Sequence, residues 1–203
     1  MLSPQVDLAS FNVSQLIGDI HGLAKKPALG AAPALVTQAA ATPTGCSPAA
    51  TALARLFVES TDYARKFEPQ ASIGELSQKL ALSKEDIVDA IHELNGLVTC
   101  HNDDLVYPEA ELFVRFDRFW MGWNPADDAL RVAAGLVNDE DFPDSPAEIA
   151  KRFEWEPRRL NPALAYLSER GLVVALRAMN SGPWFLVAMH RTDATRRFVK
   201  SRQ

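Results

Sequence analysis

The sequence of 203 residues predicts an α+β fold that is mainly helical and contains one small structural unit twice. Two observations define the unit: apolar residues recur at helical spacing in three consecutive segments, and a short hairpin pattern follows them. The third observation is repetition, because the same apolar positions return in the same order 73 residues later.

The first copy is expected over residues 51–108. Segments 97–101 and 105–108 are mostly apolar and flank Asn102-Asp103-Asp104, which predicts the hairpin. Three helices precede it, marked in order by Leu53, Leu56, Phe57, Ala64 and Phe67, then by Ile73, Leu76 and Leu80, and then by Ile87, Ile91 and Leu94.

The second copy is expected over residues 124–192. Asn124-Pro125 is typical of a helix start and opens its first helix, and its hairpin strands are expected within 172–179 and 184–191. The offset of 73 places Ser72, Glu75, Leu76, Leu80, Leu82, Ile87, Ile91 and Leu94 on Ser145, Glu148, Ile149, Phe153, Trp155, Leu160, Leu164 and Leu167.

Residues 109–123 are expected to form a helix that joins the two copies. We expect this helix to pack the copies together, to form a dimer interface, or both, because a broad apolar stripe is normally buried. The stripe consists of Leu112, Phe113, Phe116, Phe119 and Trp120.

Three further segments complete the predicted organisation. Residues 1–25 form an arm whose apolar spacing favours a short amphipathic helix, which should dock on its own chain or on a partner. Residues 26–50 are rich in alanine and proline and predict a linker. Residues 193–203 form a basic C-terminal tail that either contacts phosphates or frays.

Composition narrows the class of protein. The formal net charge is −5, and the two cysteines show neither a disulfide framework nor a zinc pattern. The N-terminus lacks a signal-peptide pattern, and no apolar run reaches the roughly 18–20 residues of a membrane span. We therefore expect a cytoplasmic protein that makes no use of a membrane.

The segment ALAYLSERGLV, residues 163–173, runs from the expected third helix of the second copy into its hairpin. Together with the order of three helices and a hairpin, it resembles tandem winged-helix proteins, broadly the MarR-like bacterial regulators. The resemblance covers residues 51–191 and implies the fold more firmly than the function. Winged helices bind DNA in many proteins, and in others they dock proteins, as in the acidic partners of chromosome-condensation complexes.

Charge differs between the two halves of the chain. Residues 1–123 carry a formal charge of −6 and residues 124–203 a charge of +1. The third helix of the first copy exposes Glu85, Asp89 and Glu93, which phosphates would repel. In the second copy the candidate DNA-binding residues are Lys151, Arg152, Arg158, Arg159, Asn161, Arg177, Arg191, Arg196 and Arg197.

The arginines that open the third helix of the second copy allow two interpretations. They contact base edges, or they form a solvated turn neutralised by Glu148, Glu154 and Glu156. Pro162 leaves open which of Arg158 and Arg159 points outward.

Two motifs with catalytic associations are set aside. Residues 18–22, GDIHG, match one element of metallophosphatases, but the further metal-binding elements of that family are missing from the sequence. Cys100 and His101 are adjacent on a strand and therefore point to opposite faces. We expect no enzyme activity, no cofactor and no metal.

We therefore expect sequence-specific binding of double-stranded DNA through the second copy, as in a transcriptional regulator, with a homodimer placing two basic helices on one duplex. The alternative is a protein-docking or scaffold module of a chromosome-maintenance or replication complex. In that case the partner contacts the N-terminal arm or the first winged helix.

Overall fold

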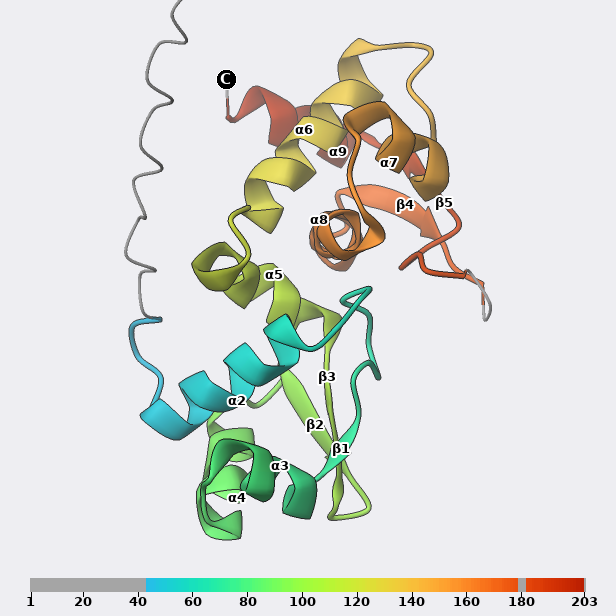
Figure 1. The fold of residues 1–203 in the computed structure, drawn as a ribbon. Helices are drawn as coiled ribbons and strands as arrows, with labels where there is room; N and C mark the ends of the chain where they lie inside the picture. Colours follow the sequence, from blue (N-terminus) through green and yellow to red (C-terminus); the bar gives the residue numbers. More distant parts are fainter. Residues whose placement is uncertain (1–42, 179–181, 203) are drawn as a thin grey trace, which may run out of the picture. The chain divides into compact units, whose positions relative to one another are not determined.

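The computed structural model describes residues 43–178 and 182–202. In this part of the chain, eight helices and two small antiparallel sheets form an α+β structure (Figure 1). The described residues belong to one compact unit, Ala40–Gln203. The expected arm 1–25, linker residues 26–42 and the turn residues Asn180 and Ser181 lie outside the described residues.

The first module comprises α2 (Pro48–Glu59), β1 (Ala71–Ser72), α3 (Ile73–Leu80), α4 (Lys84–Glu93), β2 (Val98–His101) and β3 (Leu105–Pro108). Its three strands are antiparallel in the order β1-β3-β2, so the expected hairpin is present and the two-residue strand β1 is added to it. Capping boxes start α3 at Ser72 and α4 at Ser83. Helix α2 begins at Pro48, three residues before the expected start of this copy.

The first helix is shorter than its apolar spacing predicts. Helix α2 ends at Glu59, and Ala64 and Phe67 adopt left-handed φ angles of 53° and 69° instead of helical ones. The Thr61 hydroxyl accepts hydrogen bonds from the Tyr63 and Ala64 amides, a local turn that competes with helix continuation. The assignment of Ala64 and Phe67 to this helix is therefore wrong.

The second module comprises α6 (Pro125–Asn138), α7 (Pro146–Phe153), α8 (Pro157–Glu169), β4 (Val173–Leu176), β5 (Ala188–Arg191) and α9 (Asp193–Lys200). Its order of three helices and a hairpin repeats that of the first module, without a counterpart of β1 and with α9 added at the end. Helices α3 and α7 both end at a left-handed residue, Ala81 and Glu154, which are 73 positions apart. The expected hairpin is present as the antiparallel pair β4-β5.

Helix α5 (Ala110–Trp120) joins the modules, as the sequence predicts. The side chains of Leu112, Phe113 and Phe116 are buried in the core of the first module, and Phe119 and Trp120 are half-buried against that core. On another face, Ala110 and Val114 pack on Ala165 of α8. The aromatic stripe thus packs within the described chain, which leaves little of it for a dimer interface.

The C-terminal segment is a helix. Helix α9 is capped by Thr192, and its Val199 side chain is buried in the core of the second module. The interpretation as a frayed tail is therefore wrong for residues 193–200. None of the described helices is long and apolar enough to cross a membrane.

Candidate functional site

Helix α8, which the sequence predicts to contact DNA, is enclosed by the chain. It packs on α6 within its own module and on α5 from the connection between modules (Figure 1). Eight of its residues are buried, and from Pro157 to Glu169 only Glu169 is classed as exposed, with four residues half-buried. The helix also continues through Pro162, whose ring is buried. No face of α8 is therefore open to a DNA groove.

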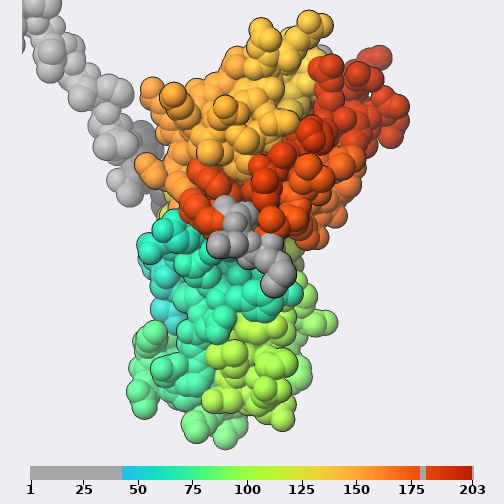
Figure 2. Space-filling view, turned by 90° about the vertical axis from the view of Figure 1, so that its right-hand side faces the viewer, coloured from blue at the N-terminus to red at the C-terminus, as the bar shows by residue number. Residues whose placement is uncertain are grey.

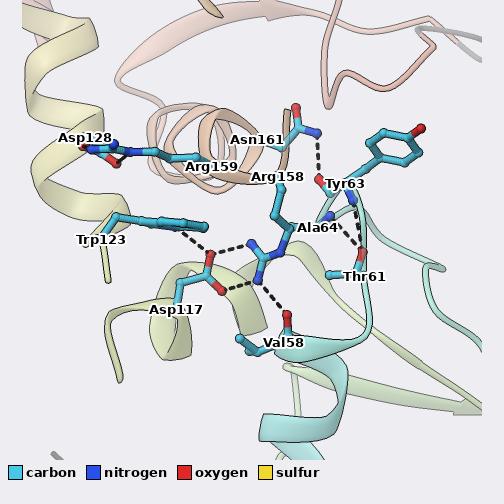
Figure 3. A network of polar contacts seen from close by, with 10 residues as sticks. All are labelled: Val58, Thr61, Tyr63, Ala64, Asp117, Trp123, Asp128, Arg158, Arg159 and Asn161. Carbon is cyan, nitrogen blue, oxygen red and sulfur yellow. Dashed lines mark hydrogen bonds and ion pairs between the residues drawn. The ribbon is translucent and has the colours of Figure 1, made fainter. Parts of the chain in front are cut away.

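Arg158 and Asp117 form a buried ion pair between α8 and α5 (Figure 3). Nη1 of Arg158 donates to Oδ2 of Asp117 at 2.7 Å, and Nη2 donates to Oδ1 at 2.8 Å. Nη2 also donates to the Val58 carbonyl at 2.9 Å, in the last turn of α2. A cation at this helix end complements the helix dipole and satisfies a carbonyl that the helix leaves unpaired. One side chain thus connects the second module to α5 and α2.

Burial governs the electrostatics of this pair. Burial raises the pKa of the Asp117 carboxyl, and hydrogen bonds and charge from Arg158, together with the Trp123 indole N–H, oppose that rise. A carboxylate in such a place depends on its counterion, because removing one member leaves an uncompensated charge. Removing one member of the pair should therefore cost more than the intact pair contributes to net stability.

Arg159 makes a second bidentate pair, with Asp128 of α6. Its Nε donates to Oδ2 at 2.7 Å and its Nη2 to Oδ1 at 2.8 Å. The guanidinium lies 4.4 Å from the ring centroid of Trp155 and 5.9 Å from that of Trp123. The hydrogen bonds to Asp128 raise the pKa of Arg159, so the group stays charged and held in place.

Asn161 fastens the second module to the segment after α2. Its side chain is fully buried, and Nδ2 donates to the carbonyls of Tyr63 and Pro183, both at 2.7 Å. Its Oδ1 accepts from the Phe185 amide at 2.8 Å. The amide thus uses both of its donors and its acceptor within the chain.

These contacts place Arg158, Arg159 and Asn161 differently from the open surface that the sequence predicts for them. Arg158 and Asn161 are buried and Arg159 is half-buried, and each of the three side chains is bonded to groups of the chain itself. The neutralising acids are Asp117 and Asp128, not the expected Glu148, Glu154 or Glu156. Arg158 points inward, and the half-buried Arg159 is turned toward Asp128.

The other predicted DNA-binding residues are exposed and come from α7, the β4-β5 hairpin and α9. Arg152 pairs with Asp139, Arg177 with Glu169, and Arg196 with Asp193. Arg191 donates to the Leu136 carbonyl at 3.1 Å. Lys151 of α7 and Arg197 of α9 are exposed and have no ion-pair partner within the described residues.

The acids missing from the predicted site carried a signal in the sequence. Asp117 lies four residues after Phe113 and three before Trp120, so helical spacing puts it on the apolar face of α5. Asp128 lies four residues before Val132, so helical spacing puts it on the apolar face of α6. A carboxylate on an apolar helix face requires a buried partner, and arginine supplies it bidentately.

The junction of the modules forms a groove beside α8, here called the junction groove. A cavity of about 740 Å³ is lined from both modules, by Ile91, Val98, Thr99 and Cys100 of the first and by Arg177 and Phe185 of the second. A second cavity of about 590 Å³ shares Lys66, Arg177 and Phe185 with it, so the two adjoin. Figure 2 shows the junction from one side, with the orange and red atoms of the second module above the cyan atoms of the segment after α2.

The charges that line the junction groove are balanced. Nζ of Lys66 lies 3.1 Å from Oε2 of Glu109, and Arg177 pairs with Glu169. Glu111 pairs with Arg170 at 2.8 Å. The groove therefore has no strong field of either sign.

Comparison with family models gives no match for this chain, and no curated protein matches it. Among the described residues, no group of three or more histidine, cysteine, aspartate or glutamate side chains could hold a metal ion.

Proposed function

We propose that this chain is a tandem winged-helix module that docks an extended segment of a partner protein in the junction groove. The observation that carries this proposal is the enclosure of α8, whose arginines and asparagine are all bound inside the chain.

The winged-helix assignment is supported by element order and by backbone detail. Each module runs through three helices into an antiparallel hairpin, and the matched left-handed residues Ala81 and Glu154 preserve the turn between its second and third helices. Glycines with positive φ, Gly96 and Gly171, lead into both hairpins.

The exposed surfaces of α4 and α8, the third helices of the two modules, favour docking over duplex binding. Helix α8 has no open face, and α4 exposes Glu85, Asp89 and Glu93, which would repel phosphates. Neither helix thus offers the cationic surface that duplex binding requires.

The occupant proposed for the junction groove is an uncharged extended segment. Strand β2 lines the groove and is an edge strand of its sheet. The Val98 amide is bonded to the Leu94 carbonyl, so an added strand would pair with the outer edge of β2 beyond Val98. Ile91 and Phe185 supply apolar contacts, and the balanced ion pairs favour neither an acidic nor a basic segment. Asp117 and Arg158 align the modules that form the two walls.

Alkylation of Cys100 tests this proposal, because this half-buried thiol lines the groove. Peptides would be selected from a displayed random library on the full chain, synthesised, and added during alkylation followed by mass spectrometry. Burial and the nearby Asp103 and Asp104 carboxylates raise the pKa of Cys100, so the reaction is run at mildly alkaline pH. At a concentration of ten times its Kd, a bound peptide should slow alkylation about tenfold.

Cys46 is the internal control, since it packs beside α2 and does not line this groove. Its alkylation rate should stay unchanged when peptide is added, and Ile91→Asp should abolish both binding and protection of Cys100. Selected peptides that bind without protecting Cys100, or a library that yields no binder, would contradict docking at this groove.

Duplex binding is a second candidate, carried only by exposed cations outside α8. Arg197 and Lys200 of α9 and Lys151 of α7 have no ion-pair partner within the described residues. A salt titration with a labelled duplex separates the candidates. Binding that falls steeply with salt and is lost in Arg197→Ala with Lys200→Ala would favour DNA. We expect no sequence-selective binding.

A further inference from the structure

The smaller of the two adjoining cavities, about 590 Å³ in volume and here called the aromatic cavity, is lined by aromatic residues of both modules. Phe67 lines it from the first module, and Trp184 and Phe185 line it from the second. Pockets lined by rings together with a few polar groups are typical of ligand sites, and this volume is large enough for a bulky side chain. The two modules therefore present rings to one common space.

Phe67 is held at the aromatic cavity in an unfavourable backbone conformation. Its φ angle of 69° lies in the left-handed region, which a bulky residue rarely adopts, and the residue is 49% exposed. The Phe67 amide donates to the Pro108 carbonyl at 3.4 Å, and the ring centroids of Phe67 and Tyr107 are 4.6 Å apart. A glycine would adopt this φ without strain, so what the phenylalanine adds at this position is its ring.

Two cations lie over rings that line the aromatic cavity. Nζ of Lys66 lies 4.9 Å from the ring centroid of Phe67, and the Arg177 guanidinium lies 4.8 Å from that of Phe185. Both side chains are about half exposed, although each is paired with a glutamate of the chain. They are therefore accessible to the face of a further ring, while their glutamates leave little net charge for an anion.

We infer that the aromatic cavity binds an uncharged aromatic side chain, which anchors the segment docked in the junction groove. This inference rests on the proposed docking function and adds the kind of residue that the segment must carry. Ring pairs in offset or edge-to-face geometry bind more strongly than their buried area predicts, and a cation over a ring adds to this. An aliphatic side chain obtains neither contribution, so the cavity should prefer tryptophan, tyrosine or phenylalanine to leucine.

N-acetyl-L-tryptophanamide and N-acetyl-L-leucinamide are suitable probes of this preference. Each would be titrated into the full chain, and binding would be followed by the backbone amide shifts in NMR spectra. The tryptophan probe should bind with a Kd on the order of millimolar and at least about fivefold more tightly than the leucine probe. Phe67→Gly, which suits the left-handed backbone, should remove this preference. Leu105→Ala, at an exposed apolar position of β3 outside the cavity lining, is the matched control and should leave both Kd values unchanged.

Phe67→Leu keeps an apolar side chain without a ring and serves as the second variant if circular dichroism shows that Phe67→Gly is not folded. It should also lower the affinity for the tryptophan probe at least about fivefold. Equal affinities of the parent for the two probes, or a preference that the folded Phe67 variants retain, would overturn the inference. The titration uses no partner segment and the protection of Cys100 uses no probe, so failure of the inference is seen separately from failure of the docking function.

Discussion

Replacing Arg158 by methionine is expected to lower the free energy of unfolding by about 3–5 kcal/mol, a large fraction of the stability of an ordinary domain. The change removes the one cation that bonds the buried Asp117 carboxylate within the described part of the chain, and it removes the donor of the Val58 carbonyl. Denaturant unfolding of parent and variant measures the loss.

Arg170→Met is the matched control, because Arg170 joins the same two helices through an exposed pair with Glu111. An exposed pair contributes about 0–1 kcal/mol, so the control should be nearly neutral. Adding Asp117→Leu to Arg158→Met should recover part of the loss, since no buried charge then remains. Equal losses for the two single variants, or no recovery in the double variant, would show that this pair is not buried as described.

The loss caused by Arg158→Met should depend on pH. Burial raises the pKa of Asp117, and the variant lacks the main group that opposes this rise. A carboxyl with a higher pKa in the folded state contributes stability below its unfolded pKa, and that contribution is lost as pH rises through the folded pKa. The difference in stability between parent and variant should therefore shrink as pH is lowered from about 8 to about 5.

Asn161→Asp is expected to destabilise the chain by about 2–5 kcal/mol at neutral pH although it changes the shape of the side chain very little. The new carboxylate places an oxygen where Nδ2 donates to the Tyr63 and Pro183 carbonyls, and it accepts from Phe185 as before. The substitution thus removes two donors and adds a buried charge. Urea unfolding of the parent and the variant measures the effect.

Acidification should reduce the loss in free energy of unfolding that Asn161→Asp causes, because the protonated carboxyl regains one hydrogen-bond donor. Asn138→Asp, an exposed change at the end of α6, should cost less than about 1 kcal/mol at any pH. A deficit for Asn161→Asp as small as that of the control would mean that the asparagine does not hold the two modules together.

Most helices and both hairpins are determined by residues close together in the sequence, which explains why the sequence predicts them. Apolar spacing predicts four helices that the structure contains. It is carried by Leu76, Ile87 and Leu94 in the first copy and returns at Ile149, Leu160 and Leu167 in the second. The errors arise where a neighbouring side chain changes the backbone. The Thr61 hydroxyl accepts hydrogen bonds from the Tyr63 and Ala64 amides just after α2 ends. The spacing of apolar residues gives no sign of this turn.

The site was less predictable, because its partners come from elements distant in sequence. Arg158 and Asp117 are 41 positions apart, and Arg158 and Val58 are 100 apart. Formal charge alone suggests that the arginines of α8 are exposed, whereas Asp117 and Asp128 on the apolar faces of α5 and α6 indicate partners for them within the chain. The junction groove requires both modules in place and leaves no local pattern in the sequence.

Helix α8 packs on elements of both modules, so we expect the two modules to unfold together. Differential scanning calorimetry of the full chain tests this most directly. A single transition with equal calorimetric and van't Hoff enthalpies is the predicted result. Two separable transitions, one for each module, would contradict it.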